Sequence, residues 1–384
     1  MGSLLQFGLL FVCWLGALAT LLVFLESWFG LSGRARFAAR RASGAYGVIS
    51  VFVPMHGSSA KVERAVRSIF NQSYPFIEIF LIHSEEQPHF AGLAKQFQSA
   101  RSHIPVRVVT TSFPLDSQHD RTRALEQAQP AARGRWLIIL DALVNLDRFG
   151  IEMALEFAGS NEISALGLRP GLQCRSLLQR LIAPSMEQLL QMVRIANRRR
   201  SKRDAGDVES PFLLVNREAF ETVNRNNRMP GILNEQAWNV WGYQLEGFRT
   251  FEGDGSRWMW RDADVRSWSS DTDPERRYSN RSASFVIGSV LMALVSVAGL
   301  AFGFTHRLDN FVGTSILAFS AVSYSLMAVS YFLFARRLRA AGWFAPFWFL
   351  GYLPAAVLTL MEIRRGRHAA MQSSLYAKSQ KTVG

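Results

Sequence analysis

Acidic side chains follow two short apolar runs of this chain, at positions where they could meet a charged ligand. Asp141 comes directly after the run Trp136–Leu140, and Glu85 follows the run Ile77–Ile82. If these runs are parallel strands, ligands are expected at their carboxyl ends, in the loops that follow them and in the loop after Val53. Asp141 could contact a ligand or a cation there, or it could simply cap the turn after its strand.

Strand-like and helix-like segments alternate through this part of the chain. The strand-like segments are short, apolar and rich in β-branched residues, and the helix-like segments repeat their apolar residues at helical spacing. The predicted strands are 48–54, 77–82, 106–109 and 136–140, and the predicted helices are 60–71, 90–100 and 121–131. This alternation predicts a mainly parallel, doubly wound α/β sheet.

Four apolar runs have a length suited to crossing a bilayer, which needs about 20 residues. They are Leu4–Leu25, Ala283–Phe304, Phe311–Phe334 and Trp343–Met361. The first run is longer than a signal-peptide core and lacks both a basic start and a clear cleavage site, so we interpret it as a retained anchor. One N-terminal and about three C-terminal transmembrane helices are therefore expected, with the protein in the cytoplasmic (inner) membrane.

The strongly positive net charge of +13 is concentrated beside these runs. The arginines concerned are Arg34, Arg36, Arg40, Arg41, Arg336, Arg337, Arg339, Arg364, Arg365 and Arg367. Such clusters mark cytoplasmic flanks and contact anionic lipids, and they come with no nucleic-acid recognition motif, so nucleic acid is not an expected partner. A fourth full span would put the last cluster outside. A hairpin broken at Pro346 and Pro354 would keep it inside, and both arrangements stay open.

The segment Ser176–Ile195 is amphipathic, carries flanking arginines and contains Pro184. Such a segment suits a helix lying in the membrane interface. A helix that faces the core of the soluble domain is the alternative. The two cysteines, Cys13 and Cys174, suggest neither a disulfide framework nor a zinc site.

Five motifs share the order and spacing of one known family. They are Ile49–Pro54, Ser68–Pro75, Glu78–Ile82, Arg121–Leu125 and Gly134–Ala142. They resemble the opening strand, the "SL..Q.YP" segment, the second strand, the "K..AL" helix start and the "G.(Y/W)....DAD" strand of the family 2 glycosyltransferases, which have the GT-A fold. The layout of anchor, sugar-nucleotide domain and hydrophobic tail is similar to the hopene-associated and carotenoid glycosyltransferases.

The resemblance implies a nucleotide-sugar donor and a divalent cation, Mg²⁺ or Mn²⁺, which steadies the leaving diphosphate and is held by a D-x-D motif. The donor-binding residues that it implies are Pro54, Glu85, Arg121, Asp141 and Arg277. Asp141 is also the implied metal ligand. Glu235 best matches the carboxylate that deprotonates the acceptor hydroxyl, although it could instead be a solvated carboxylate at a helix start. Arg277 could instead be a juxtamembrane arginine.

Several positions depart from the family pattern. The D-x-D position reads Asp141-Ala142-Leu143, which lacks the second carboxylate, and neither Asn145 nor Asp147 stands at the family spacing. The opening loop reads His56-Gly57-Ser58 in place of asparagine and glutamate. His83-Ser84 replaces the carboxylates after the second strand, with Glu85 one step late. We interpret both histidines as loop residues rather than metal ligands.

Two functions from different classes are compatible with this sequence. The first is a membrane-bound, inverting hexosyltransferase that moves a sugar to a lipid acceptor at the cytoplasmic face, either with a weakened cation site or with arginines in place of the cation. The second is a catalytically inactive relative that acts as a scaffold or regulator of a membrane-protein partner. The expected divisions are an anchor (1–30), a GT-A-like domain (46–270), membrane helices (283–362) and a basic tail (363–384).

Overall fold

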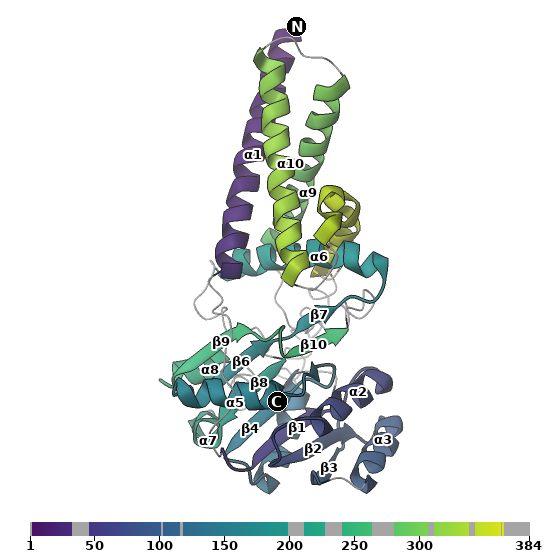
Figure 1. Ribbon diagram of the computed structural model, residues 1–384, viewed down its shortest axis with the longest axis vertical. Coiled ribbons are helices and arrows are strands. Elements are labelled where there is room, and N and C mark those ends of the chain that lie inside the picture. The colour runs from purple at the N-terminus through teal and green to yellow at the C-terminus, as the bar shows by residue number, and fades with distance from the viewer. Residues whose placement is uncertain are drawn as a thin grey trace, which may run out of the picture. The chain divides into compact units, whose positions relative to one another are not determined.

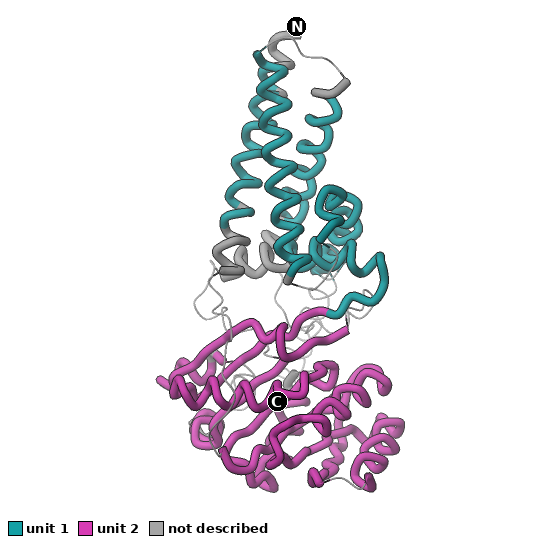
Figure 2. The backbone as a smooth tube through the Cα atoms, viewed as in Figure 1, with its two compact units in different colours: residues 1–33, 173–202, 263–384 teal, residues 34–172, 203–262 magenta. Residues whose placement is uncertain are grey.

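The chain forms two compact units, and each is assembled from segments that are distant in sequence (Figure 2). A computed structural model describes residues 2–32, 46–100, 103–115, 118–198, 211–226, 240–262, 280–305, 311–337, 342–361 and 363–364. One unit comprises residues 34–172 and 203–262. The other comprises residues 1–33, 173–202 and 263–384. The stretch 173–202, expected within the sugar-nucleotide domain, therefore groups with the apolar helices.

The first unit is built on a seven-stranded sheet with the order β3-β2-β1-β4-β8-β6-β9 (Figure 1). The strands are β1 (Ile49–Pro54), β2 (Ile77–Ser84), β3 (Val106–Thr111), β4 (Trp136–Leu140), β6 (Ala165–Arg169), β8 (Phe212–Asn216) and β9 (Thr250–Asp254). The first four pair in parallel, whereas β8 is antiparallel to both β4 and β6. The predicted mainly parallel α/β sheet is thereby confirmed.

Helices cover both faces of this sheet, because successive strand residues point to opposite sides. On β1, Val51 and Val53 belong to one buried cluster and Phe52 to the other. Residues of α2 (Ser59–Phe70), α3 (Pro88–Ser99) and α5 (Gly150–Ser160) fill the first cluster. Residues of α4 (Gln118–Ala128), α7 (Arg217–Asn226) and α8 (Val240–Leu245) fill the second. A short 3-10 turn, η1 (Gln129–Ala131), follows α4.

A second, three-stranded sheet has the order β5-β10-β7. Its strands are β5 (Asn145–Leu146), β7 (Gly171–Gln173) and β10 (Met259–Asp262). Because β5 begins a few residues after β4 ends, this small sheet follows directly in sequence from the carboxyl edge of the main sheet.

The second unit is helical and contains α1 (Gly2–Ser32), α6 (Leu177–Arg198), α9 (Asn280–Thr305) and α10 (Phe311–Arg337). By length and composition, two described segments could cross a bilayer, Phe311–Arg336 and Gly342–Met361. The apolar parts of α1 and α9, Leu10–Leu22 and Val286–Phe302, are shorter. The expected number of spans is thus only partly supported.

Hydroxyl groups link the long helices of this unit. Ser323 on α10 hydrogen-bonds Thr20 on α1 at 2.9 Å and Ser296 on α9 at 2.6 Å. In apolar surroundings such contacts satisfy polar groups that would otherwise be costly to bury. Figure 1 shows α1, α9 and α10 running side by side, with α6 lying across one end of them.

A tyrosine of α10 supplies the hydrogen bond that is lost at the proline inside α6. Pro184 has no N–H, so the carbonyl of Arg180, four residues earlier, loses its helical partner. The Tyr331 hydroxyl donates to the carbonyl oxygens of Arg180 and Leu181, each at 3.1 Å. The apolar face of α6, with Ile182, Met186 and others buried, packs on the apolar helices. It is therefore not a helix in the core of the sheet domain, and its position in a membrane interface stays a prediction.

The last apolar segment is not one regular helix. Residues Gly342–Phe347 form a 3-10 turn, η5, that contains Pro346, and residues 348–361 continue as an α-helix. The Tyr324 hydroxyl on α10 donates to the Pro346 carbonyl. In Figure 1 this yellow segment lies beside the end of α10 that is near α6 and does not follow α10 along its whole length. By length and composition Gly342–Met361 is still a candidate span, so the full span and the proline-broken hairpin both stay open.

A glycine lets this segment approach α6, and we expect Gly351→Ala to lower the thermal stability of the helical unit. A Cβ at Gly351 would lie 2.2 Å from the Leu181 carbonyl oxygen, a backbone atom that cannot move aside alone. Overpacking of this kind costs about 1–3 kcal/mol. The matched control is Gly288→Ala on α9, where no atom lies within 4 Å. Unfolding of the detergent-purified protein would be measured, and equal melting temperatures for the two variants would contradict the prediction.

Candidate functional site

The carboxyl ends of β1, β2 and β4 meet at one edge of the main sheet. Pro54, the last residue of β1, pairs with Ile82 of β2, and Phe52 pairs with Ile139 of β4. The backbone N–H of Met55 continues this pairing, because it donates to the Ile82 carbonyl at 2.7 Å. Loops that leave these strand ends therefore lie next to one another, as the strand pattern predicts.

The loop between β1 and α2 is shaped by Gly57. Its φ of +79° lies in the left-handed region, where a side chain would be strained. The turn places His56 two residues after the end of β1 and Ser58 at the N-cap of α2, where the Ser58 carbonyl accepts the Val62 N–H at 3.0 Å. The sequence His56-Gly57-Ser58 is thus a tight connection that fixes the imidazole at the strand edge.

Asp141 follows β4 in a similarly tight turn. Its N–H donates to the Pro211 carbonyl at 2.9 Å, just before β8 begins. Its Oδ1 atom accepts the N–H of Leu143 at 2.8 Å. Asp141 therefore does cap the turn after its strand. Its side chain nevertheless remains 20% exposed, so a turn role and a ligand role are compatible.

His56 and Asp141 face one another across these two loops. The His56 Nε2 atom lies 3.6 Å from Asp141 Oδ1, and the two side chains are 15% and 20% exposed. The sequence did not predict this pair, because the residues belong to different loops and His56 was interpreted as a loop residue without a ligand role. Its position in the loop that follows the first strand is the only signal in the sequence.

The missing second carboxylate of the D-x-D is replaced by buried apolar surface. Leu143 is only 5% exposed, and its methyl group would lie 3.5 Å from a Cβ at Gly57. Asn145 donates its side-chain N–H to the Trp260 carbonyl at 3.4 Å, and Asp147 accepts the Phe149 N–H at 3.3 Å. Neither Asn145 nor Asp147 joins Asp141, so neither supplies the absent carboxylate.

The end of β2 places one carboxylate at the same edge and keeps the histidine inside. Glu85 is exposed, and its N–H donates to the Thr111 carbonyl at 2.9 Å. His83 is a strand residue, 5% exposed, with Nε2 at 3.3 Å from the Thr110 hydroxyl on β3. The interpretation of His83 as a loop residue is therefore wrong. It is a buried residue of β2.

Arg121 lies on α4 and is buried at 8% exposure. Its Nη1 atom is 3.5 Å from the Leu115 carbonyl, so part of its guanidinium holds the segment that leads into α4. Glu235 and Arg277, the predicted base and diphosphate ligand, lie outside the described residues. Their predicted roles stay predictions.

The described residues offer a divalent cation a small set of ligands. Among them no group of three or more His, Cys, Asp or Glu side chains is placed to hold a metal ion. Asp141 and His56 together supply one carboxylate and one imidazole. A cation that also binds substrate phosphates and water needs only one or two protein carboxylates, so this pair fits a cation that is shared with a bound diphosphate.

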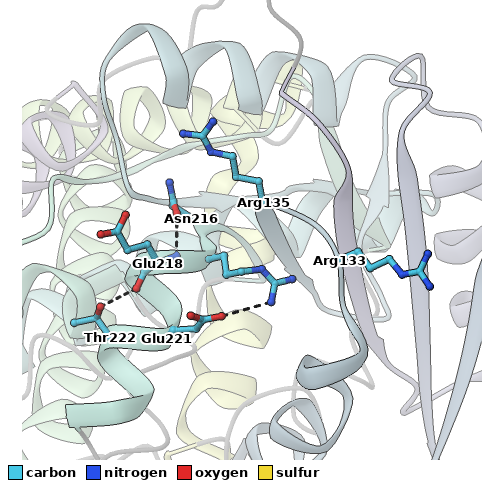
Figure 3. Close-up of a pocket in the computed structure, with 7 residues that line it drawn as sticks. Arg133, Arg135, Asn216, Glu218, Glu221 and Thr222 are labelled. Atoms are coloured by element: carbon cyan, nitrogen blue, oxygen red, sulfur yellow. Dashed lines mark hydrogen bonds and ion pairs between the residues drawn. The ribbon is translucent and has the colours of Figure 1, made fainter.

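Two surface pockets open at the opposite, amino-terminal edge of β4. The larger, of about 570 Å³, is lined by Arg133, Arg135, Asn216, Arg217, Glu218, Glu221 and Thr222 (Figure 3). Arg217 is committed to structure, because it donates to the carbonyls of Ala132 and Gly134 at 2.8 Å each. The smaller pocket, of about 420 Å³, shares Arg135 and Asn216 with it. These pockets lie at the opposite end of β4 from Asp141 and are not the candidate site.

The domain has a mainly parallel sheet between two helical layers, and an acidic residue stands at the end of β4, where the ends of β1, β2 and β4 form a ligand edge. These features define a mixed α/β domain of the GT-A-like class. Residues 50–223 match the family model described as Glycosyl transferase family 2. The chain therefore carries a family 2 glycosyltransferase domain. A comparison with the curated proteins gives no significant match.

Solved structures with a similar course of the chain are glycosyltransferases. The mannosyltransferase PcManGT from Pyrobaculum calidifontis, in complex with GDP-Man and Mn²⁺, is 15% identical with a TM-score of 0.46, and the match covers 91% of this chain and 98% of that one. TarS 1-349 of S. aureus is 14% identical with a TM-score of 0.39, over 85% of this chain and 91% of that one. At this level of similarity we transfer no residue role from them.

Proposed function

We propose that the protein is a membrane-bound glycosyltransferase that moves a hexose from a nucleotide-sugar to a lipid acceptor at the cytoplasmic face, with inversion. The observation that carries the proposal is the partly exposed carboxylate of Asp141 at the end of β4, within a family 2 domain. A carboxylate at this edge, next to the ends of β1 and β2, is positioned where such sheets bind their ligands.

In the proposed reaction, the acceptor hydroxyl attacks the anomeric carbon from the face opposite the nucleotide. The new C–O bond forms as the bond to the diphosphate breaks, and Glu235 takes the hydroxyl proton. Glu85 and Pro54 contact the nucleotide, and Arg277 steadies the departing diphosphate. A divalent cation, Mg²⁺ or Mn²⁺, bound at Asp141 would neutralise the charge that develops there. Arg121 is buried, so it would hold the segment that leads into α4 rather than touch the donor.

The membrane part of the proposal rests on the apolar segments, the arginine clusters and the exposed start of α6. Phe311–Arg336 and Gly342–Met361 are apolar enough to span a bilayer, and arginine clusters flank the apolar runs of the sequence. At its start, α6 exposes Leu177 and Leu178 at 65% and 59%, beside Arg175. Apolar side chains next to cations favour a lipid surface, and thus a lipid-linked acceptor, over a soluble one.

Donor binding tests this function directly. We expect UDP, GDP or dTDP to raise the melting temperature of the detergent-purified protein. The measurement is made once with Mn²⁺ and once without it, to show whether the shift depends on the cation. Asp141→Ala and Asp141→Asn should both lose the shift. The asparagine variant keeps an acceptor for the Leu143 N–H, so its loss would report the charge rather than the turn. Asp147→Asn is the matched control and should behave as the wild type.

A catalytically inactive scaffold is the second candidate, and the burial of Leu143 at the D-x-D position favours it. It predicts no shift with any of the three nucleotides from a sample whose unfolding is cooperative. That outcome would overturn the transferase proposal and direct attention to a membrane-protein partner.

A further inference from the structure

The departures from the family pattern at His56 and Leu143 occur in the same place. Leu143 removes the second D-x-D carboxylate and packs toward Gly57. The residue before Gly57 is His56, whose imidazole points at the remaining carboxylate. One possible ligand is thus lost at residue 143, and another side chain with a lone pair is present on the facing loop.

The distance between the two side chains suits a shared ion better than a direct bond. At 3.6 Å, His56 Nε2 and Asp141 Oδ1 are too far apart for a hydrogen bond, which needs 2.7–3.2 Å. Two ligands of one metal ion, each bonded at about 2.0–2.2 Å, are commonly separated by slightly more than 3 Å. A small closure of the two loops would bring both atoms onto one ion.

The supporting contacts hold both ligands in place. Asp141 is oriented by the N–H of Leu143 at 2.8 Å, and its backbone is tied to Pro211. His56 is placed by the left-handed turn at Gly57, between the buried end of β1 and the start of α2. Groups that orient metal ligands in this way are typical of metal sites.

We propose that His56 replaces the lost carboxylate as the second protein ligand of the donor-bound divalent cation. This inference rests on the proposed function, because the remaining ligands would be diphosphate and water oxygens. Imidazole is a ligand for transition metals, whereas Mg²⁺ prefers oxygen. The His56–Asp141 pair therefore selects a divalent transition metal over Mg²⁺, which a D-x-D pair of carboxylates would not do to the same extent.

Direct detection of metal binding tests this inference without an activity assay. The untagged, full-length protein in detergent is mixed with UDP or GDP and Mn²⁺, and a nucleotide-only blank is subtracted. Pulsed electron paramagnetic resonance should detect nitrogen coupling from an imidazole on Mn²⁺. The coupling should disappear in His56→Ala, and the affinity for Mn²⁺ should fall at least about 10-fold. His103→Ala removes an exposed histidine elsewhere in the same unit and should change neither reading.

A second variant tests the selectivity. His56→Asp supplies an oxygen ligand in place of nitrogen, so it should keep a cation but narrow the preference for Mn²⁺ over Mg²⁺. Wild-type coupling and affinity in His56→Ala would overturn the inference. So would the absence of metal binding in a folded wild type. Nucleotide binding by the wild type, measured with and without Mn²⁺, separates the two proposals. If binding occurs in either arm while His56→Ala leaves both metal readings unchanged, only the His56 ligand is wrong. If the folded wild type binds no nucleotide in either arm, the donor site is wrong.

Discussion

Gly134→Ala is expected to lower the free energy of unfolding of the sheet unit by about 3 kcal/mol, at the upper end of the usual cost of overpacking. A Cβ at Gly134 would lie 2.5 Å from the backbone nitrogen of Ser50 and 2.6 Å from its hydroxyl oxygen. The nitrogen cannot yield, because the neighbours of Ser50 are held in the sheet, where Ile49 pairs with Trp136 and Val51 pairs with Ile138. The Gly134 N–H also donates to the Ser50 hydroxyl at 2.9 Å, and this bond would be displaced.

The control for this variant is Gly92→Ala on α3. Gly92 is exposed, and no atom lies within 4 Å of its Cβ position. Alanine in a helix interior is favoured over glycine by about 0.5–1 kcal/mol, so Gly92→Ala should stabilise. Urea unfolding monitored by tryptophan fluorescence gives both midpoints. If the two midpoints moved in the same direction, the steric account of Gly134 would be wrong.

Glu78→Ala should cost about 3 kcal/mol, the upper end of the penalty for removing the acceptor of buried hydrogen bonds. Glu78 on β2 is 4% exposed. Its Oε1 atom accepts the Ser50 hydroxyl and the Arg133 N–H, both at 2.6 Å, and Arg107 lies 4.0 Å from its other oxygen. Truncation to alanine would leave the buried Ser50 hydroxyl and the part-buried Arg133 N–H without their acceptor.

Glu78→Gln separates hydrogen bonding from charge at the same position. The glutamine oxygen can still accept from Ser50 and Arg133, while the attraction to the half-exposed Arg107 is lost. Glutamine should therefore recover most of the stability that alanine loses, as measured by the urea midpoint. Equal losses in the two variants would mean that the charge, and not the acceptor, stabilises the start of β4.

The parts of the fold that follow local patterns were predictable from the sequence. The strand Trp136–Leu140 has the bounds that its apolar run indicates, since a run buried on both faces needs no partner to be recognised. The apolar run of β8 is a local signal for a strand, but its antiparallel place between β4 and β6 depends on pairing across a long stretch of chain. The short strand β9 was also missed, because Gly253 breaks its apolar pattern.

The candidate site was predictable only in part. Asp141 and Glu85 could be placed at a strand edge, because ligands of parallel sheets gather there. The burial of Arg121 and the meeting of His56 with Asp141 depend on tertiary packing between separate loops, so neither could be inferred from spacing. Glu235 and Arg277 remain predictions that only the donor-binding and activity experiments can reach.

The place of β8 in the sheet has a consequence for synthesis on the ribosome. β8 is the only described strand that joins β4 to β6, yet it is made after the chain has left the sheet unit for α6. Until residue 216 emerges, β4 and β6 both present open edges that can pair with other chains. A nascent chain paused within residues 173–210 would therefore be prone to aggregation. Dependence on chaperones at this stage is therefore expected of its biosynthesis.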